Sequence, residues 1–584
     1  MHFNTLSPRV APFYTHLEIP TEAKPWPSPV PGQPRRASIN SFGEIQIVFS
    51  YLQVTVLANA QTGFGGTNAH AILETYEVQP AKQAVMPAFT PLVVSAASKT
   101  SLRAMLSELC DFLKAKPDTN LRDLAYTLHT RRSTLPFRQV IAGMNVQEVI
   151  SGIDSVLAED DSGLNTRYFG VPSPEILGVF TGQGAQWPRM GARLIEASPF
   201  AAERLAELDR ALSSLPEADR PQWSLKDQLL ADPSVSRLSE AAISQPLCTA
   251  VQIVLVDMLK LAGIKLHAVV GHSSGEISAA YAAGFLSAMD AIRIAYYRGL
   301  YAKLAKSPNG AKGAMMAVGT SFEDALEFCE LEVFEDRLQV AARNSSASIT
   351  LSGDEDAIAE AVEIFKDEGK FARQLKVDTA YHSHHMQPCA APYIEAMKRC
   401  KVTVGDGSGP TWYSSVSGGQ VMTKETLGPQ YWVENMTQAV LFSPAVTAAV
   451  AEAGPFDLAL EIGPHPALKG PALDTIEEVA GGRVPYSGVL SRGKNDVVEL
   501  SSALGFTWMN LGAGSVDFDT FEKIVSDVWH PKSLVTDLPK YPFDHSRSFM
   551  MLTRLSGGHA NIHSPPHPLL GRRCFEHGAA AEPV

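Results

Sequence analysis

The sequence lacks the features that mark membrane-spanning, secreted and nucleic-acid-binding proteins. Its 584 residues hold no run that approaches the roughly 18 consecutive apolar residues of a membrane span, and the N-terminus has no apolar signal core. No Lys/Arg-rich run occurs and the formal net charge is -13, so we expect no nucleic-acid partner. The six cysteines form no CxxC pair, which is typical of free thiols in a reducing compartment. The sequence therefore predicts a cytoplasmic protein that does not bind a membrane.

The composition is that of a globular protein with more than one domain. Apolar residues make up 45% of the chain and charged residues 19%, which argues against extensive disorder. A chain of this length exceeds what one hydrophobic core usually serves, so we expect two or three domains. Proline is concentrated in "KPWPSPVPGQP" at 24–34, which indicates an extended linker.

Apolar patterns along the chain alternate between strands and helices. "PLVVSAAS" at 91–98 and the periodic segments after it predict a small α/β module ending near residue 170. "EILGVFTGQGAQW" at 175–187 and "AVVGHSSGEISAAYAAG" at 268–284 each predict a buried strand, a tight turn and, in the second, a helix. Such alternation is typical of a parallel sheet.

A second kind of pattern occupies residues 313–377, where strands and helices follow in the order βαββαβ of a ferredoxin-like unit. "PFDLALEIGPHPAL" at 455–468 returns to the larger sheet, and a wrapping linker is expected from about 485. The fold class is therefore α/β: an α/β-hydrolase-like large subdomain with a parallel sheet, an inserted ferredoxin-like small subdomain and a small α/β linker domain. A cleft is expected between the two lobes.

Ser273 is the candidate nucleophile. It stands in Gly271-x-Ser273-x-Gly275, where an apolar strand precedes the turn and a helix of small residues follows it. Glycines on both sides permit the sharp strand-to-helix turn that exposes a hydroxyl, and the helix N-terminus favours a nearby oxyanion. We favour this interpretation over a structural serine turn.

A serine hydroxyl needs a base, and His382 in "AYHSH" is the candidate, at the end of a predicted strand. His384 and His385 follow closely and could suggest a metal cluster. Zinc sites need spaced, convergent ligands, and no Cys or acidic partner recurs here. We therefore expect no metal, with His384 and His385 on the surface.

Two further residues could complete such a site. Gln183 lies in a glycine loop at a strand end, where its backbone N–H could join that of Ser274 in an oxyanion hole. Arg298 lies on a largely apolar helical segment. Its planar guanidinium would suit a carboxylate on an acyl group, although a surface position is nearly as compatible with the sequence.

Taken together, "GQGAQW", "GHSSGE", Arg298, "TAYHSHHM" and "EIGPHPAL" resemble the malonyl-CoA:acyl-carrier-protein acyltransferase domain of type I polyketide synthases. The resemblance spans about 175 to 480, with the motifs in the family's order. It implies that Ser273 is acylated and that His382 is the general base. It also implies that Gln183 and Ser274 supply oxyanion amides and that Arg298 holds the malonyl carboxylate.

The family orients its histidine by backbone carbonyl groups, which agrees with the lack of an obvious third acid in this sequence. The substrate-selecting position before the histidine is Tyr381, and an aromatic ring there resembles the malonyl type more than the methylmalonyl type. "TAYH" is neither standard tetrapeptide of the family. We also expect His272 and Asn344 to bind substrate.

The flanking segments resemble neighbouring parts of a fungal highly reducing polyketide synthase. Residues 1–74 resemble a ketosynthase C-terminal remnant without its catalytic Cys and His motifs, and 75–170 the linker to the acyltransferase at 171–484. Residues 485–555 resemble a post-acyltransferase linker, and 556–584 the truncated start of a dehydratase.

The expected function is the transfer of malonyl from malonyl-CoA, through an acyl-serine, to the phosphopantetheine thiol of an acyl carrier protein. No cofactor bound by this chain is expected, because the phosphopantetheine belongs to the partner. Other polyketide synthase domains are the further partners. The alternatives are a serine hydrolase or thioesterase, which shares the turn around Ser273, and a non-catalytic fragment.

Residues 44–63 interrupt a motif and predict a retained intron. Their removal joins "RRASINSFG" to "FGGTNAH" and restores the uninterrupted family motif. Gly43-Glu44 can be encoded by GGTGAG, Ala58-Asn59 by GCTAAC, and Thr62-Gly63 can contain CAG, which are plausible splice signals. Sequencing the gene and its transcripts should show GT at codon 43, AG near codon 63 and a spliced, in-frame product. A gene that lacks the GT at codon 43 or the AG near codon 63 would rule the intron out and make the segment a genuine surface insertion.

Overall fold

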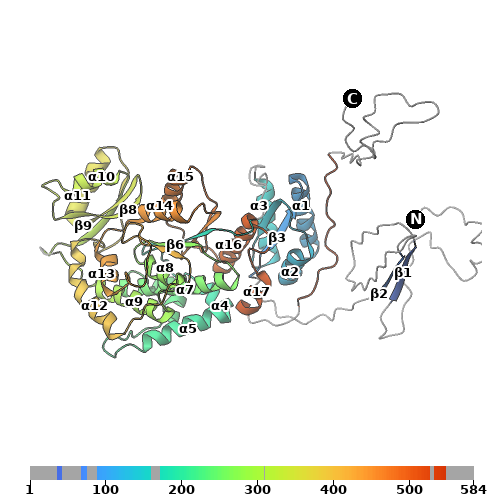
Figure 1. Ribbon diagram of the computed structural model, residues 1–584, viewed down its shortest axis with the longest axis horizontal. Helices are drawn as coiled ribbons and strands as arrows, with labels where there is room; N and C mark the ends of the chain where they lie inside the picture. Colours follow the sequence, from blue (N-terminus) through green and yellow to red (C-terminus); the bar gives the residue numbers. More distant parts are fainter. Residues whose placement is uncertain are drawn as a thin grey trace, which may run out of the picture. The chain divides into compact units, whose positions relative to one another are not determined.

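The computed structural model describes residues 36–42, 68–74, 89–159, 171–307, 310–526 and 532–546. The chain divides into two compact units, Met1–Gln83 and Ala84–Val584. Figure 1 shows the elements in sequence colours.

The first unit contains an antiparallel pair of strands, β1 (Arg36–Phe42) and β2 (Asn68–Glu74). Phe42 lies opposite Asn68, so the chain leaves β1 and re-enters β2 at adjacent positions. The segment 44–63 lies outside the described residues. The identity of this unit as a ketosynthase remnant stays a prediction.

The second unit begins with the predicted small α/β module. Its strands β3 (Leu92–Ala96) and β4 (Phe137–Ile141) pair antiparallel. Its helices are α1 (Lys99–Ala115), α2 (Leu121–Arg131) and α3 (Val146–Ala158). Each helix starts at a residue whose side chain accepts a hydrogen bond from the first turn, namely Ser98, Asn120 and Asn145.

The main sheet has five parallel strands in the order β11-β6-β5-β12-β13. These are β5 (Ile176–Phe180), β6 (Ala268–Gly271), β11 (Thr411–Tyr413), β12 (Leu458–Ile462) and β13 (Tyr486–Gly488). The three central strands, β6, β5 and β12, are buried along their whole length, because helices cover both faces of the sheet. The predicted parallel sheet is confirmed.

Helices join and cover these strands. Before the small subdomain they are α4 (Ala192–Ala197), α5 (Pro199–Ser213), α6 (Leu225–Leu230), α7 (Ala241–Leu261), α8 (Gly275–Ala282) and α9 (Ala288–Ala302). After it they are α12 (Ala390–Arg399), α13 (Pro429–Thr437), α14 (Phe442–Ala453), α15 (Lys469–Ala480), α16 (Asp496–Leu511) and α17 (Phe518–Ser526). Short 3-10 helices occupy Pro233–Val235 and His384–Cys389.

Helix α7 is the one described helix that is long and apolar enough to cross a membrane by length and composition. Within the fold, 89% of its most apolar window is buried. Its Gln252 donates to the backbone carbonyls of Thr181 and Ile462, at 2.8 and 3.1 Å, which attaches the helix to the ends of β5 and β12. It is a core helix of the large subdomain.

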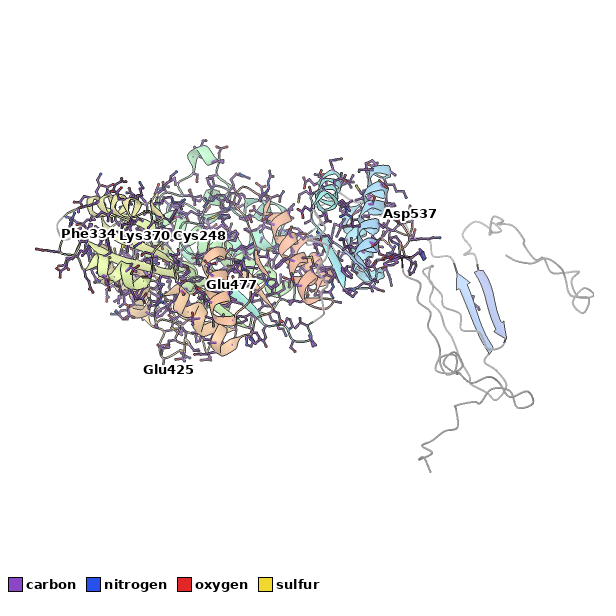
Figure 2. The ribbon with its side chains drawn as sticks, turned by 90° about the horizontal axis from the view of Figure 1, so that it is seen from above. Cys248, Phe334, Lys370, Glu425, Glu477 and Asp537 are labelled. Atoms are coloured by element: carbon purple, nitrogen blue, oxygen red, sulfur yellow. The ribbon has the colours of Figure 1, made fainter. Side chains whose placement is uncertain are left out.

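The small subdomain is an antiparallel four-stranded sheet in the order β10-β7-β9-β8 with two helices. Its elements are β7 (Gly313–Val318), α10 (Phe322–Cys329), β8 (Leu338–Ser345), β9 (Ser348–Asp354), α11 (Glu355–Asp367) and β10 (Ala372–Gln374). This βαββαβ order confirms the predicted ferredoxin-like unit. Figure 2 labels Phe334, which belongs to its core, and Lys370 at this end of the unit.

Residues beyond 484 form more regular structure than the wrapping linker that we expected. Strand β13 is hydrogen-bonded to β12, so the main sheet continues past the boundary predicted at 484. Helix α16 contacts the linker module through Arg138, which donates to the Met509 carbonyl at 2.9 Å. Asp537, labelled in Figure 2, forms an ion pair with Lys116, the C-cap residue of α1 in the linker module.

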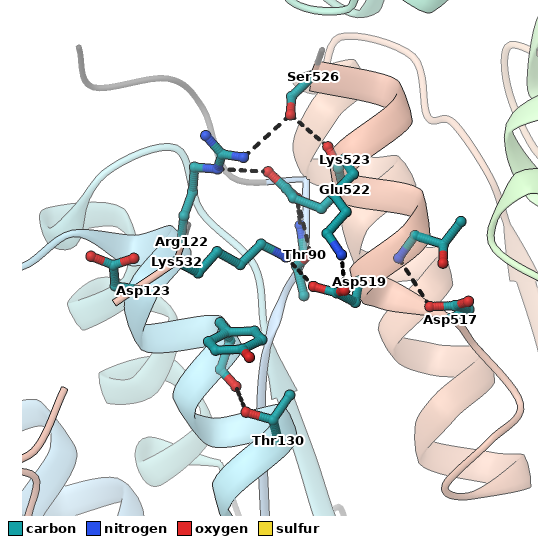
Figure 3. Close-up of polar contacts among 12 residues, drawn as sticks. Thr90, Arg122, Asp123, Thr130, Asp517, Asp519, Glu522, Lys523, Ser526 and Lys532 are labelled. Atoms are coloured by element: carbon teal, nitrogen blue, oxygen red, sulfur yellow. Dashed lines mark hydrogen bonds and ion pairs between the residues drawn. The ribbon is translucent and has the colours of Figure 1, made fainter. Parts of the chain in front are cut away.

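A buried ion pair attaches the linker module to α17 (Figure 3). The Glu522 carboxylate lies 3.0 Å from Nε of Arg122 on α2, and both side chains are almost fully buried. Its second oxygen accepts from the backbone amides of Phe89 and Thr90 and from the Thr90 hydroxyl, at 2.9–3.0 Å. The carboxylate therefore binds the start of the linker module and α2 at the same time.

Glu522→Gln should destabilise the protein by about 3–5 kcal/mol, because it leaves the buried Arg122 without its counter-charge. The measurement is urea unfolding of the full chain. The control is Glu240→Gln, which breaks the half-exposed pair between Glu240 and Arg237 and should change the unfolding midpoint far less. Equal shifts in the two variants would contradict a stabilising role for the buried pair.

Candidate active site

The turn between β6 and α8 holds Ser273 in a strained backbone conformation, with φ of 54°. The glycines on either side are required by close backbone approach. A Cβ at Gly271 would lie 2.4 Å from the Glu276 nitrogen, and one at Gly275 would lie 2.3 Å from the Phe180 carbonyl oxygen. The predicted strand, turn and helix are confirmed, and Ser273 stands at the carboxyl end of a central parallel strand.

The hydroxyl of Ser273 contacts the base predicted from the sequence. Ser273 Oγ lies 2.7 Å from His382 Nε2, and His382 Nδ1 lies 2.8 Å from the backbone carbonyl oxygen of Gln438. Because that carbonyl only accepts, Nδ1 carries the hydrogen and Nε2 is free to take a proton from Ser273. No carboxylate contacts His382 in the part of the chain that the structure describes.

Burial, together with the smaller effect of the nearby positive charge of Arg298, lowers the pKa of His382 to about 3. The imidazole is therefore neutral, and able to act as a base, at any pH near neutrality. The geometry and the protonation state agree with a serine–histidine dyad whose histidine is oriented by the backbone.

Arg298 on α9 has a fully buried guanidinium beside the nucleophile. Its NH2 group donates to Ser273 Oγ at 3.2 Å, its NH1 group to Gln245 Oε1 at 2.9 Å and its Nε to Asn435 Oδ1 at 3.2 Å. Among the described residues no carboxylate pairs with it. The surface alternative for Arg298 is therefore wrong, and burial lowers the pKa of its guanidinium.

Gln245 and Asn435 were missed by the sequence reasoning. Gln245 is a buried polar residue on the apolar helix α7, and Asn435 is one on α13. Asn435 also donates to the Ser273 carbonyl at 2.8 Å, so it contacts both the turn and the guanidinium. For Gln245, a polar side chain within a largely apolar helical stretch was the available signal.

The two amides proposed for an oxyanion hole come from adjacent loops. A Cβ at Gly182, next to Gln183, would lie 3.2 Å from Ser273 Cβ, so the loop after β5 runs past the nucleophile. Neither the Gln183 nor the Ser274 amide donates to a protein acceptor within the described ranges. Both are available to an incoming oxygen, which is compatible with the predicted role.

Tyr381 is buried beside the guanidinium, with Arg298 5.9 Å from the centre of its ring. The side chains of Gln183 and Gln245 lie beside its hydroxyl, and Gln245 Nε2 donates to Gln183 Oε1 at 3.1 Å. Burial raises the pKa of the Tyr381 hydroxyl. Tyr381 and Gln245 thus lie against the guanidinium of Arg298, and Gln183 is joined to Gln245.

His272 and Asn344 are brought together by the structure, although they are distant in the chain. His272 Nε2 lies 2.8 Å from Asn344 Oδ1 on β8 of the small subdomain. The pair therefore joins the turn to the small subdomain. Substrate binding by these two residues stays a prediction.

The surface position expected for His384 and His385 is wrong for His385, which is buried and lies 2.7 Å from Asp354. Asp354 is an acidic neighbour that the sequence pattern did not reveal, because it lies on the distant strand β9. The ligand atoms of the three residues lie within 4.8 Å of one another. The absence of a metal stays a prediction.

Two family models match the chain. The model described as "Acyl transferase domain" matches residues 178–506, and the model described as "CurL-like, PKS C-terminal" matches residues 90–153. The first match contains Ser273, Arg298 and His382 together with the inserted small subdomain.

Curated relatives are similar along almost the whole chain. "Hybrid PKS-NRPS synthetase tasS" of Hapsidospora irregularis is 65% identical over 99% of this chain. "Equisetin synthetase eqxS" of Fusarium heterosporum is 59% identical over 99%. The chain spans 14% of the length of each of these proteins.

Solved acyltransferase domains share the fold. The acyltransferase domain from module 8 of the salinomycin polyketide synthase aligns with a TM-score of 0.63 and 27% identity, covering 74% of this chain and 97% of that domain. A loading acyltransferase from the avermectin synthase aligns with a TM-score of 0.51 and 28% identity, covering 56% and 98%.

A fluorophosphonate should label Ser273, because the dyad presents an activated hydroxyl. Ser273→Ala should abolish labelling, and His382→Ala should slow it by about 10²- to 10⁴-fold, the usual contribution of a general base. Intact-mass spectrometry of the full chain measures both. Undiminished labelling in either variant would remove the assignment of that residue.

Proposed function

Because the chain belongs to the acyl transferase family and is an acyltransferase region of a polyketide synthase, we propose that it transfers malonyl from malonyl-CoA to an acyl carrier protein. The intermediate is an ester on Ser273. The acceptor is the phosphopantetheine thiol of the carrier.

The observation that carries the malonyl assignment is the buried guanidinium of Arg298, 3.2 Å from Ser273 Oγ, with no carboxylate partner among the described residues. A buried charge is costly unless it is paired, so a ligand carboxylate would restore the missing counter-charge. The distance to Ser273 Oγ corresponds to an acyl group that carries its carboxylate a short way from the ester. Malonyl has that form, and acetyl has no carboxylate.

The reaction consists of two matched half-reactions. Ser273 Oγ attacks the thioester carbonyl carbon while His382 Nε2 takes the hydroxyl proton, and the carbon–sulfur bond then breaks. The departing coenzyme A sulfur receives that proton. The carrier thiol enters by the reverse route: His382 takes its proton, the sulfur attacks the ester carbonyl carbon, the bond from that carbon to Ser273 Oγ breaks, and His382 returns the proton to Oγ. The Gln183 and Ser274 amides would stabilise the oxyanion in both halves.

Tyr381 supports malonyl over methylmalonyl in this proposal. Its ring is buried beside Arg298, and the side chains of Gln183 and Gln245 lie beside its hydroxyl. An α-methyl branch on the bound acyl group would have to compete with this ring for space.

The remaining parts of the proposal concern the surroundings of the site. No cofactor is bound by this chain, and the partners are malonyl-CoA, the carrier protein and other polyketide synthase domains, without nucleic acid or membrane. We place the protein in the cytoplasm. The highly reducing subtype and the dehydratase start at 556–584, which lies outside the described residues, are further parts of the proposal.

Arg298→Ala should lower malonyl loading of Ser273 relative to acetyl loading by about 10- to 100-fold, since charge-assisted hydrogen bonds contribute roughly 1.5–3 kcal/mol. Intact-mass analysis after mixed malonyl-CoA and acetyl-CoA gives the ratio. Arg293→Ala, on the same helix, is the control and should keep the wild-type ratio. An unchanged ratio in Arg298→Ala would show that the guanidinium does not hold the carboxylate.

A chase with carrier protein separates transferase from hydrolase. The loaded wild-type chain should pass malonyl to the carrier faster than it releases malonate. Release mainly as free malonate, despite ample carrier, would favour the hydrolase alternative. No loading at all would favour the non-catalytic fragment.

A further inference from the structure

A second fully buried charged group, which the chemistry above does not use, lies directly behind the nucleophile. Glu276 is the second residue of α8, three residues after Ser273, and its side chain has no exposed surface. A buried carboxylate is costly unless donors surround it. Its contacts therefore indicate what it holds in place.

Five donors surround the carboxylate, from three different elements. One oxygen accepts from the Gly271 amide at 3.0 Å, the Ser415 amide at 3.3 Å and the Ser415 hydroxyl at 3.1 Å. The other accepts from Trp412 Nε1 at 3.1 Å and from the Tyr431 hydroxyl. These groups belong to the end of β6, to β11 with the residues after it, and to α13.

Two of these elements bear directly on the reacting groups. Gly271 is the residue from which the turn to Ser273 begins. Helix α13 carries Asn435, which donates to the Ser273 carbonyl and accepts from Arg298. The chain just after α13 supplies the Gln438 carbonyl that orients His382. The Glu276 carboxylate thus connects the nucleophile's turn to the helix that positions both the guanidinium and the base.

We propose that Glu276 is a positioning residue: its ionised carboxylate holds the β6–α8 turn against α13, so that Ser273, His382 and Arg298 keep their mutual distances. This inference deepens the proposed function and rests on it. Glu276 acts through these residues and does not contact the acyl group.

The ionised form fits this arrangement, because all five contacts are donated to the carboxylate. A proton on either oxygen would face a donor and displace at least one of these hydrogen bonds. Tyr431 is the titratable side chain in direct contact, and burial raises the pKa of its hydroxyl well above the usual value, so it remains a donor. The negative charge of Glu434, on the same helix, also raises the pKa of the Tyr431 hydroxyl.

Burial raises the pKa of Glu276 to about 7, while the hydrogen bonds from Tyr431 and Ser415 oppose this rise. The carboxyl is therefore neutral below about pH 7 and ionised above it. The rate of reaction at Ser273 should then increase with pH through this region. His382 does not titrate there, because its pKa is lowered to about 3.

The chain offers a matched control in Glu461 on β12, two strands away from β6. Its carboxylate is also buried, its pKa is also raised to about 7 by burial, and it accepts from the Tyr486 hydroxyl at 2.6 Å and the Leu468 amide at 2.9 Å. It holds the loop after β12 and makes no contact with the turn at Ser273.

The test compares Glu276→Gln with Glu461→Gln in the full chain from pH 5.5 to 8.5. Fluorophosphonate labelling of Ser273 reports nucleophile geometry without any thioester, and single-turnover malonyl loading reports the proposed reaction. Glu276→Gln should slow both by about 10- to 100-fold, as small misplacements of reacting groups do, with little change in the malonyl-CoA concentration for half-saturation. Glu276→Gln should also remove the increase of the Ser273 reaction rate near pH 7. Glu461→Gln should keep both the wild-type rate and its increase with pH.

Equal effects of the two substitutions, or a rise near pH 7 that survives in Glu276→Gln, would overturn the inference. Failure of the proposed function is distinguishable, since the wild type would then load no malonyl while the labelling comparison still holds.

Ser415→Ala provides a variant that removes a single hydroxyl, in case Glu276→Gln does not fold. Loss of one donor to the ionised carboxylate should raise its pKa and move the pH midpoint of labelling upward. An unmoved midpoint would also overturn the inference.

Discussion

The burial of one guanidinium beside a serine hydroxyl is the constraint on which the arrangement of this site depends. Arg298 is held by the Gln245 side chain on α7, by Asn435 on α13 and by Ser273 itself. A guanidinium without a counter-charge in such surroundings requires fixed neutral acceptors, and these fix the helices that carry them. Gln245 and Asn435 are therefore polar residues at buried positions, and the oxygens of both side chains accept hydrogen bonds from the guanidinium.

The same arrangement explains how a dyad operates without a third acid. Burial and, to a smaller extent, the positive charge of Arg298 keep the His382 imidazole neutral, while the Gln438 carbonyl fixes the hydrogen on Nδ1. A carboxylate beside the histidine would raise its pKa and would also compete for the guanidinium. Without such a carboxylate, His382 stays neutral, and Arg298 stays available for the proposed binding of an acyl carboxylate.

Features that depend on local pattern were predictable from the sequence. The GxSxG turn requires its glycines, and the βαββαβ order is visible in the periods of two and 3.6, so Ser273 and the small subdomain were found. His382 was found because a serine nucleophile needs a base, and Arg298 because it is a charged residue on a largely apolar helical segment; the resemblance then implied the roles of both. Gln245, Asn435 and Glu276 were given no role, since most of the groups that they contact lie far away in the chain. The role of the Gln438 carbonyl could not be predicted, because it is a backbone group that every residue type carries.

The errors have the same physical origin. His385 was expected at the surface because its partner, Asp354, lies on a different strand that no local pattern connects to it. The segment after 484 was expected to be a wrapping linker, yet β13 completes the sheet and α17 is held by the buried pair of Glu522 with Arg122. In both cases a contact between distant parts of the chain decided the outcome.

The central claim is that the guanidinium of Arg298 receives the carboxylate of an acyl group on Ser273. A crystal structure of the chain carrying malonyl on Ser273 tests it most directly. The account predicts both carboxylate oxygens within hydrogen-bonding distance of Arg298, with the ester oxygen facing the Gln183 and Ser274 amides. A malonyl carboxylate directed to solvent, with the guanidinium still bound only to Gln245 and Asn435, would contradict it.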